Sequence, residues 1–416
     1  MQLQTILNRV EKHRSFVYEH TGWANAEQSA LLIRVRARAR SRAHCSACGR
    51  RGPTYDHLAP RRFQFVPLWG LLVFFEYAMR RVACPRCGVK VEMVPWAEGK
   101  SPLTRSYAWF LARWAKRLSW KEVAETFRTS WDQVYSAVHM AVTWGLKHRE
   151  MARIRAIGVD EILWQRGHRY LTVVYQIDAH CRRLLWVGLD RKKETLDGFF
   201  DDFGVQASKR LRFVCSDMWK PYLDVICERA SRAIHVLDRY HVVAKLNKAV
   251  DEVRAGEARR MKADGYEPVL KHSRWALLKN PWNLTATQNE KLADLLKYNL
   301  RTVRAYLLKE ELQHLWSYRS SYWAGAFLDR WCTRALRSRI EPMQKMARTL
   351  RSHRALLLNW FAARGEISAG PVEGFNHKAK LTFRKAHGFR SFPVAKTALL
   401  HTLGKLPEPE YIHRFC

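Results

Sequence analysis

Two cysteine pairs constrain the fold of this chain more than any other feature of its sequence. Cys45 and Cys48 form one C-x-x-C pair, Cys84 and Cys87 form a second, and 35 residues separate the two pairs. Each C-x-x-C turn can present two thiolates to one metal ion, and four thiolates complete the tetrahedron that Zn²⁺ prefers. The spacing therefore predicts one structural zinc ion. The alternative is a redox-active pair.

The residues between the two pairs predict a β-hairpin. Residues 61–66 and 72–77 are rich in aromatic and apolar side chains, as short strands are, and the turn Pro67–Gly70 joins them. We interpret residues 40–97 as a zinc-ribbon domain and expect residues 1–39 to form an N-terminal helical segment. The total of nine cysteines is odd, which argues against a disulfide framework.

The charge of the chain points to a polyanionic partner. Lys and Arg number 73 against 38 Asp and Glu, a formal net charge of +35, while 47% of the residues are hydrophobic. That apolar content excludes a disordered polycation, and the charge attracts nucleic acid. The alternative is that the basic residues only solvate the surface. We find no signal peptide and no apolar run of the roughly 18 residues that span a bilayer, so we expect a soluble, cytoplasmic protein without a membrane partner.

Residues 103–150 have the apolar spacing of helices. Two capping boxes each open a helix, and a short break lies between them, in the order Ser119–Glu122, Arg128–Thr129 and Ser130–Gln133. Two short helices around a tight turn are typical of a helix-turn-helix domain, and the alternative is an αα-hairpin in a helical bundle. The residues expected to contact DNA are Arg128, Ser130, Trp131 and Gln133.

The sequence from residue 154 predicts a multidomain α/β protein whose central sheet is mixed. Three strand-like runs with short polar connections predict an antiparallel meander, at residues 157–164, 170–177 and 183–187. Helices and strands then alternate, at residues 194–203, 211–215, 221–230 and 233–237, which is typical of a mixed sheet.

Residues 239–365 show almost no strand pattern, and we interpret them as a long helical insertion. Five tryptophans there either line DNA or a second subunit, or form a helical core; they are Trp275, Trp282, Trp316, Trp323 and Trp331.

Two aspartates at predicted strands are candidate metal ligands. Asp160 lies within an apolar strand and Asp217 directly follows another. A carboxylate in such a place requires a partner, and a divalent cation is a common one. Glu161 is adjacent to Asp160, but successive strand side chains point to opposite faces, so we expect Asp160 and not Glu161 to share a site with Asp217. The alternative is that both aspartates are ordinary residues of strand-end turns.

A third candidate carboxylate lies far downstream. Pro371 suits the first position of a helix, and Glu373, Asn376, His377 and Lys380 then follow one face of that helix. We interpret this stripe as a metal- and phosphate-binding face. The alternative is that Glu373 only complements the helix dipole. Three carboxylates suit two Mg²⁺ ions that activate the attacking oxygen and stabilise the leaving oxygen in phosphodiester chemistry.

Asp238 and His241 form a smaller candidate group where a strand leads into a helix. Their spacing of three residues allows the two side chains to meet, and they could orient a ligand or contact a phosphate. The alternative, a helix cap beside a hydrogen-bonded histidine, is about equally consistent with the spacing.

The succession of these motifs resembles the ISL-three family of bacterial insertion-sequence transposases, from about residue 45 to residue 400. Besides the cysteine pairs and the helix-turn-helix, the matching motifs are Gly158–Glu161, Cys215–Trp219, Asp238–His241, Gly370–Asn376 and Gly388–Phe392. The resemblance implies a DDE transposase with an RNase-H-like core. It also implies that Asp160, Asp217 and Glu373 are the catalytic carboxylates that bind two Mg²⁺ or Mn²⁺ ions. His377 is a departure, because many relatives carry a second Asn there.

The resemblance further implies a function and an organisation. The chain would bind the terminal inverted repeats of an element as a homodimer or larger assembly on double-stranded DNA, near the bacterial nucleoid, and catalyse DNA cleavage and strand transfer. The alternatives are a DNA-binding transcriptional regulator without catalysis and a guide-RNA-associated nuclease.

The expected parts are the helical segment (1–39), zinc ribbon (40–97), helix-turn-helix (103–150), first part of the core (154–240), insertion (241–366), final core helix with the glutamate (367–400) and tail (401–416).

Overall fold

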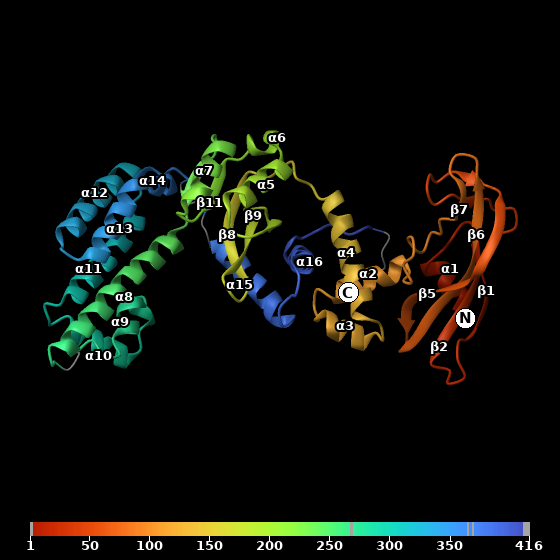
Figure 1. Ribbon diagram of the computed structural model, residues 1–416, viewed down its shortest axis with the longest axis horizontal. Helices are drawn as coiled ribbons and strands as arrows, with labels where there is room; N and C mark the ends of the chain where they lie inside the picture. Colours follow the sequence, from red (N-terminus) through yellow and green to blue (C-terminus); the bar gives the residue numbers. More distant parts are fainter. Residues whose placement is uncertain (1–2, 267–268, 364–365, 368–369, 411–416) are drawn as a thin grey trace. The chain divides into compact units, whose positions relative to one another are not determined.

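The computed structural model describes residues 3–266, 269–363, 366–367 and 370–410. They divide into two compact units, each with its own internal contacts. Figure 1 labels their helices and strands. The first unit contains the described residues up to Arg149 and those from Leu381 onward, and the second unit runs from Glu150 to Lys380. None of the helices in these described stretches combines the length and the apolar character needed to span a bilayer.

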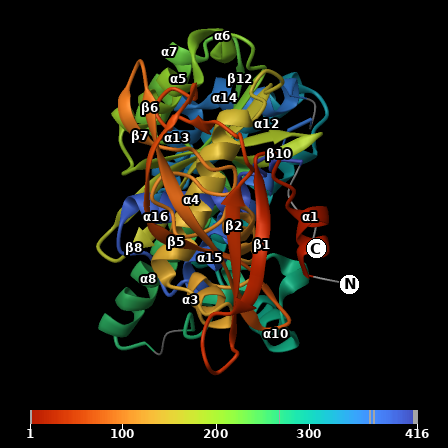
Figure 2. The same cartoon turned by 90° about the vertical axis from the view of Figure 1, so that its right-hand side faces the viewer.

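A five-stranded sheet dominates the first unit. In Figure 2, β1 and β2 lie side by side as an antiparallel pair, and the strands follow the order β1-β2-β6-β5, with β7 paired to β6. The elements are α1 (Leu3–Val10), β1 (Phe16–Trp23), β2 (Ala30–Ala37), β3 (Ala43–His44), β4 (Arg51–Gly52), β5 (Thr54–Leu68), β6 (Leu71–Cys84) and β7 (Gly88–Val91). The predicted hairpin is confirmed as β5 and β6, and both strands extend well beyond the predicted runs. Phe63, Phe75 and Trp96 are fully buried against this sheet.

The prediction of a helical segment over residues 1–39 is wrong beyond α1. Residues Phe16–Trp23 and Ala30–Ala37 are strands, and β2 pairs in parallel with β6. In β2, Ile33 and Val35 are buried while Arg34 and Arg36 are exposed, which is the alternation of a strand with one buried face. The N-terminal residues therefore extend the sheet whose strand β6 ends at Cys84.

Four helices complete the first unit: α2 (Arg105–Trp114), α3 (Trp120–Thr126), α4 (Trp131–His148) and α16 (Phe392–Leu403). The capping box at Ser119 is confirmed, because its hydroxyl accepts from the backbone N–H of Glu122 and the Glu122 carboxylate accepts from the Ser119 N–H. The second box is only half formed. Ser130 accepts from the Gln133 N–H, but the Gln133 side chain accepts from the Thr129 hydroxyl.

The prediction of one final helix over residues 367–400 is also wrong. The structure has α15 (Gly370–Lys385) and, after a break, α16. His387 and Gly388 both have positive φ in this break, a conformation that interrupts helices. The boundary between the two units falls inside α15, after Lys380, and α16 packs against α4 in the first unit.

The second unit contains a mixed sheet in the order β10-β9-β8-β11-β12. Strands β8, β9 and β10 form the predicted antiparallel meander, and β11 runs parallel to both β8 and β12. The elements are β8 (Ala156–Gln165), β9 (Arg169–Asp178), β10 (Cys181–Leu189), α5 (Lys193–Phe203), α6 (Val205–Ser208), β11 (Phe213–Ser216), α7 (Lys220–Arg229) and β12 (Ile234–Leu237). The predicted alternation of strands and helices is confirmed.

Helices cover both faces of this sheet. On one face, Phe199 of α5 and Val225 of α7 belong to an apolar core with Val159 of β8. On the other face, α15 approaches β8 so closely that a Cβ atom on Gly158 would lie 2.4 Å from Cγ2 of Val372. Glycine at position 158 is therefore what lets α15 lie directly on the strand that carries Asp160.

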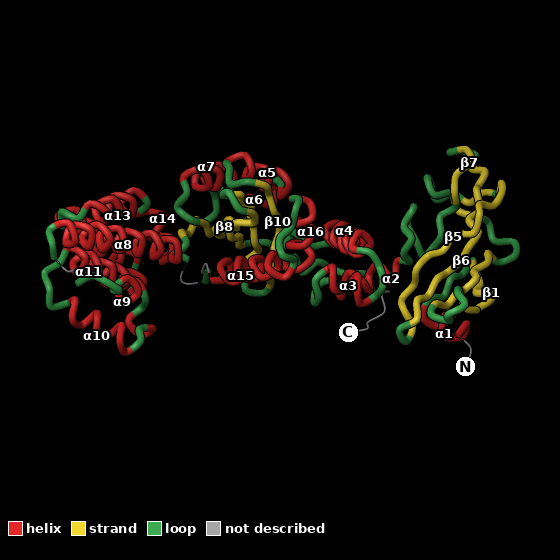
Figure 3. The backbone as a smooth tube through the Cα atoms, turned by 60° about the horizontal axis from the view of Figure 1, so that its bottom comes forward, coloured by secondary structure: helices red, strands yellow, loops and turns green. Residues whose placement is uncertain are grey.

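The described residues between β12 and α15 form only helices and loops (Figure 3), as predicted. They are α8 (Arg239–Ala263), α9 (Arg274–Leu278), η1 (Pro281–Asn283), α10 (Ala286–Leu295), α11 (Arg301–Gln313), η2 (His314–Ser317), α12 (Ser321–Arg337), α13 (Glu341–Ser352) and α14 (Arg354–Ala362). The helical-core alternative holds for two of the five tryptophans, and contact of the other three with DNA or a second subunit stays a prediction. Trp316 and Trp331 are buried in a helical core, whereas Trp275, Trp282 and Trp323 are exposed.

Candidate metal centre and acidic site

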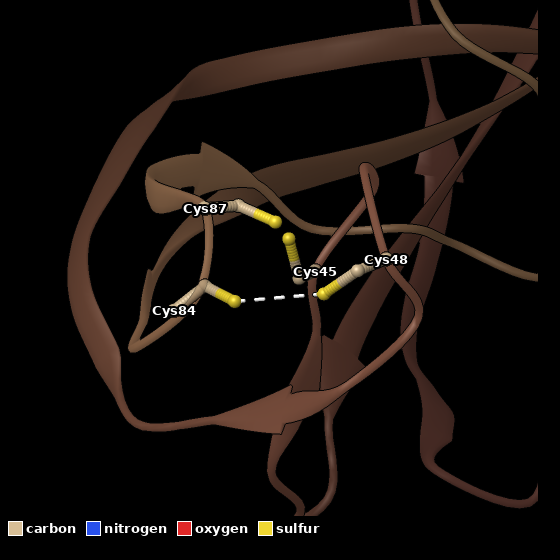
Figure 4. A group of neighbouring side chains, drawn as sticks. All are labelled: Cys45, Cys48, Cys84 and Cys87. Atoms are coloured by element: carbon tan, nitrogen blue, oxygen red, sulfur yellow. Dashed lines mark hydrogen bonds between the residues drawn. The ribbon is translucent and has the colours of Figure 1, made fainter.

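The four cysteines of the two C-x-x-C pairs converge on one point. Their Sγ atoms all lie within 4.8 Å of one another, and Figure 4 shows the four side chains directed toward a common centre. Gly49 and Gly88 follow the two pairs with φ of +72° and +71°, which only glycine adopts readily. The donors are thiols in the number and arrangement that zinc prefers, so this cluster suggests a zinc site.

The thiols of this cluster differ in acidity. A backbone N–H of Arg86 donates to the Cys84 sulfur and lowers the pKa of Cys84 to about 7. The hydrogen bond with Cys48 and burial raise the pKa of Cys87 to about 12. One sulfur is thus readily a thiolate and another is held protonated by its neighbours. A divalent cation would remove this difference, because bound thiols are deprotonated outright.

Asp160 lies on the sheet face that α15 covers. Asn376 of α15 donates from Nδ2 to Asp160 Oδ2 at 2.6 Å, and the Tyr175 hydroxyl donates to Asn376 Oδ1 at 2.9 Å. Phe375 stacks on Tyr175 with ring centroids 4.9 Å apart. The buried Asp160 carboxylate is therefore fixed by a chain of hydrogen bonds from β9 through α15.

Asp238 and His241 meet, as their spacing allows, and Asp160 joins them. His241 Nε2 lies 3.7 Å from Asp160 Oδ1 and 3.7 Å from Asp238 Oδ2. The Asp160 carboxylate, with added effects of Asp238 and Asp217, raises the pKa of His241 to about 9 although burial opposes this. Asp238 also caps α8 by accepting from the Tyr240 N–H at 2.7 Å, so the ligand-orienting and the capping interpretations both describe it.

Asp217 directly follows β11, and its hydrogen-bond partners are Trp219 and Arg191. Its Oδ1 accepts from the Trp219 N–H at 2.9 Å, and its Oδ2 accepts from Nη2 of Arg191 at 3.2 Å. Nε of Arg191 lies 2.8 Å from Oε1 of Glu161. Arg191 therefore links Asp217 to Glu161, contrary to the expectation from strand alternation that Asp160 and not Glu161 would share a site with Asp217.

Burial, with the negative charge of Asp217, raises the pKa of Glu161 to about 7, while Arg191 opposes this. Burial likewise raises the pKa of Asp238 to about 6, with added effects of Asp160 and Glu373 and an opposing effect of His241. Sequence reasoning missed the pair of Glu161 and Arg191, because nothing in the spacing links a strand residue to a loop 30 positions later.

The three candidate carboxylates share neighbours but do not touch. The charges of Asp160 and Asp217 both raise the pKa of His241, and the charges of Asp160 and Glu373 both raise the pKa of Asp238. Glu373, His377 and Lys380 are exposed on α15, so Asn376 is the member of that predicted stripe with a bond to Asp160. Among the described residues, the four cysteines form the one group of three or more potential ligands whose donor atoms lie within 4.8 Å.

The acidic cluster nevertheless has the donors that a hard cation requires. Carboxylate oxygens are the ligands that Mg²⁺ and Mn²⁺ prefer. Oε2 of Glu161 is buried without a hydrogen-bond partner. The basic partners of the cluster are Arg191 and His241. Its carboxylates are more numerous: Asp160, Glu161, Asp217, Asp238 and Glu373. The side chains present thus fit divalent metal ions.

The predicted DNA-contacting residues all lie at the start of α4 or just before it. Arg128 and Trp131 are exposed, and Trp131 stacks on Tyr135 with centroids 5.6 Å apart. Ser130 and Gln133 have side chains already engaged in hydrogen bonds at the helix start. Contact of these residues with DNA remains a prediction.

Comparisons with known proteins agree on one family. The family model DDE_Tnp_ISL3, described as "Transposase", matches residues 157–399. The transposase for insertion sequence element IS1557 of Mycobacterium tuberculosis is 35% identical over 395 residues, which cover 89% of this chain and 87% of that protein. The transposase for IS1001 of Bordetella parapertussis is 30% identical over 349 residues, covering 83% of this chain and 85% of that protein.

Proposed function

Because this chain belongs to the ISL-three family of insertion-sequence transposases, we propose that it cleaves and joins DNA at the acidic site of its second unit. Asp160, Asp217 and Glu373 would bind two Mg²⁺ or Mn²⁺ ions. The observation that carries the proposal is the hydrogen bond of Asn376 to Asp160. It places the helix that bears Glu373 beside the strand that bears Asp160, although more than 200 residues separate them.

The topology supports an RNase-H-like core. An antiparallel meander of three strands is followed by two parallel strands, in the order β10-β9-β8-β11-β12. Asp160 lies on the central strand β8, and Asp217 follows the adjacent parallel strand β11. We propose that residues 154–240 and 367–380 form this core and that residues 241–366 interrupt it as a helical insertion.

Each side chain around the carboxylates has a task that its contacts suggest. The metal ions, when bound, would activate the attacking oxygen and stabilise the leaving oxygen. Asn376 orients Asp160 through its hydrogen bond. His241 lies 3.7 Å from both Asp160 and Asp238, where a ring N–H can donate to a phosphate oxygen of the DNA. Asp238 holds His241 in place at 3.7 Å.

The first unit would supply DNA recognition. We propose that residues 40–97 form a zinc-binding module and that residues 103–150 form a helix-turn-helix domain, which bind the terminal inverted repeats. Lys and Arg would contact phosphates, while side chains at the start of α4 would read base edges. The exposed Arg128 and Trp131 suit this role best. Pairing of two element ends would require a dimer or a larger assembly.

Cleavage of end DNA by the full chain tests the proposal. Wild type with Mg²⁺ should nick DNA that carries the element's terminal repeat. Asp217→Asn should lower the cleavage rate more than about 100-fold, because groups that merely orient metal ligands already contribute 10–100-fold. DNA binding should persist. The matched control is Asp224→Asn, which removes a carboxylate from an exposed ion pair with Lys220 and should leave cleavage unchanged.

Two outcomes would contradict the proposal. Equal cleavage by wild type and Asp217→Asn would show that the acidic site is not responsible. Specific binding of end DNA by a folded, metal-supplied wild type without cleavage would favour the DNA-binding regulator.

A further inference from the structure

A cation of the chain itself lies between two carboxylates of the acidic site. Nε of Arg191 is 2.8 Å from Glu161 Oε1, and Nη2 of the same guanidinium is 3.2 Å from Asp217 Oδ2. Glu161 and Asp217 have side chains only 12% and 10% exposed, whereas the Arg191 side chain is 32% exposed. The two acids are therefore nearly buried, while the arginine that bridges them is about one third exposed to solvent.

The position of Arg191 differs from that of a purely structural ion pair. Its guanidinium carbon lies 4.5 Å from the centre of the Trp219 ring, so the aromatic face provides a platform that does not use up hydrogen-bond donors. The residue belongs to the short loop between β10 and α5. A side chain on such a loop can leave one partner with little change of the backbone.

Two positive charges cannot both occupy the space beside Asp217 without mutual repulsion. Oδ1 of Asp217 accepts from the Trp219 N–H, and Oδ2 is the oxygen that accepts from Arg191. A metal ion bound by Asp217 would therefore lie near the guanidinium, whose charge opposes it. Arginine also has a strong alternative partner, since its planar fork matches a phosphate group.

From these contacts we infer that Arg191 is an internal competitor of the metal ion at Asp217 and that DNA releases it. Without DNA, the single positive charge of Arg191 offsets part of the negative charge of Glu161 and Asp217 and weakens metal binding. When a DNA phosphate reaches the site, the guanidinium moves to it and leaves Asp217 to the metal. Glu161 is then a positioning residue: its ion pair with Arg191 keeps the guanidinium beside Asp217 until DNA binds. This inference rests on the proposed function, because it assumes that Asp217 binds the metal.

Direct measurement of Mn²⁺ binding tests the inference independently of catalysis. Zinc-loaded wild type and Arg191→Gln would be titrated with Mn²⁺ by electron paramagnetic resonance, with and without end DNA, and Asp217→Asn would define background binding. Without DNA, Arg191→Gln should bind Mn²⁺ about 10-fold more tightly than wild type, within the usual range of coupling between sites. DNA should tighten Mn²⁺ binding by wild type and much less by the variant.

Two further variants separate this role from a general effect of charge or folding. Arg182→Gln removes an exposed arginine of β10 in the same unit and should leave Mn²⁺ affinity unchanged. Arg191→Lys keeps the charge but loses the planar fork, and it should retain weak Mn²⁺ binding without DNA while responding less to DNA. Thermal unfolding of each variant checks that it is folded.

The outcomes distinguish the inference from the proposed function. Equal or weaker Mn²⁺ binding by folded Arg191→Gln, with wild type still binding above the Asp217→Asn background, would overturn the competitor role and leave the metal site intact. Mn²⁺ binding no stronger than background in every protein, with and without DNA, would overturn the proposed site and the inference with it.

Discussion

The cysteine cluster and the acidic site are two candidate metal centres that the chain assembles in opposite ways. The four sulfur atoms already lie within 4.8 Å of one another. In the acidic site, basic side chains instead lie between the carboxylates. Arg191 lies between Glu161 and Asp217, and His241 lies between Asp160 and Asp238.

The difference follows from the chemistry of the ligands. A thiol whose pKa lies well above neutrality is largely uncharged, and Cys84, with a pKa lowered to about 7, adds at most one negative charge to the cluster. Four thiols can therefore lie close together before a metal arrives. Carboxylates are negatively charged at neutral pH, and their close approach is unfavourable without a cation. A structural zinc site can therefore be built by turns alone, whereas the acidic site requires internal cations that a metal and a phosphate later replace.

Loss of zinc should have the largest effect of any change, and it should be confined to the first unit. Cys84→Ser should abolish binding of about one zinc per chain and expose the backbone amides of β5 and β6 to hydrogen exchange, because structural zinc contributes about 10–16 kcal/mol in small zinc-binding modules. Omission of Mg²⁺ should leave exchange in β8 unchanged. Zinc analysis and hydrogen exchange of each segment measure both effects.

Cys227→Ser is the matched control for this substitution. Cys227 is an exposed free cysteine of α7 and should not affect zinc content or exchange. Equal zinc content in Cys84→Ser and Cys227→Ser would show that the cluster does not hold a metal, and the contrast between the two centres would then disappear.

The acidic site should depend on close packing where the cysteine site depends on turn geometry. Gly158→Ala places a Cβ atom 2.4 Å from Val372 Cγ2, so α15 must move away from β8. We expect a loss of about 1–3 kcal/mol in the free energy of unfolding and a lower cleavage rate, because Asn376 no longer reaches Asp160. Denaturant unfolding and DNA cleavage assays measure the two effects.

Gly374→Ala serves as the control on the same helix. A Cβ atom at Gly374 would meet no heavy atom within 4 Å, and alanine is the better helix former, so stability should stay equal or rise. Val372→Ala should partly rescue Gly158→Ala by restoring space. If Gly158→Ala were as stable and as active as wild type, close approach of α15 would not be what assembles the site.

The sequence predicted the elements of the second unit well because local patterns determine them. The meander over residues 157–187 and the strand before Asp217 follow from runs of apolar residues, and the meeting of Asp238 with His241 follows from their spacing of three. The sequence did not predict β1 and β2 as strands, because residues 1–39 contain α1 and no marked turn motif of a hairpin. It also did not predict the break between α15 and α16, which depends on positive φ at His387 as well as at Gly388.

The sequence predicted only those site residues whose charge is unusual in an apolar segment. Asp160 and Asp217 are carboxylates at apolar strands, so their placement demanded a partner. Arg191 is one of 73 Lys and Arg residues, and nothing nearby in the sequence distinguishes it. Its importance arises from the fold, which brings the loop after β10 to the end of β11. Contacts of this kind are invisible to patterns within a single segment.

A decrease in pH should have the smallest effect on stability. It acts through His235, a second histidine close to the acidic site. His235 is buried on β12 with Nε2 2.7 Å from the Ser216 hydroxyl, and burial lowers the pKa of His235 to about 4. The unfolded chain binds this proton near pH 6.5 but the folded chain does not, so stability falls as the pH decreases from about 6.5 toward 4. Between pH 6.5 and 5.5 the loss should be about 1 kcal/mol.

His235→Gln isolates this effect, because glutamine can keep the hydrogen bond with Ser216 and does not titrate. His241, whose pKa is raised, behaves oppositely: its contribution is complete below about pH 6.5 and is lost only as the pH rises through about 9. Wild type and variant share His241 and the cysteine cluster, so both cancel in the difference between their denaturant unfolding curves at each pH. An identical pH dependence of the two proteins would mean that His235 takes up its proton as readily in the folded chain as in the unfolded chain. Below about pH 6.5 it would then add a second cation beside Asp217 besides Arg191.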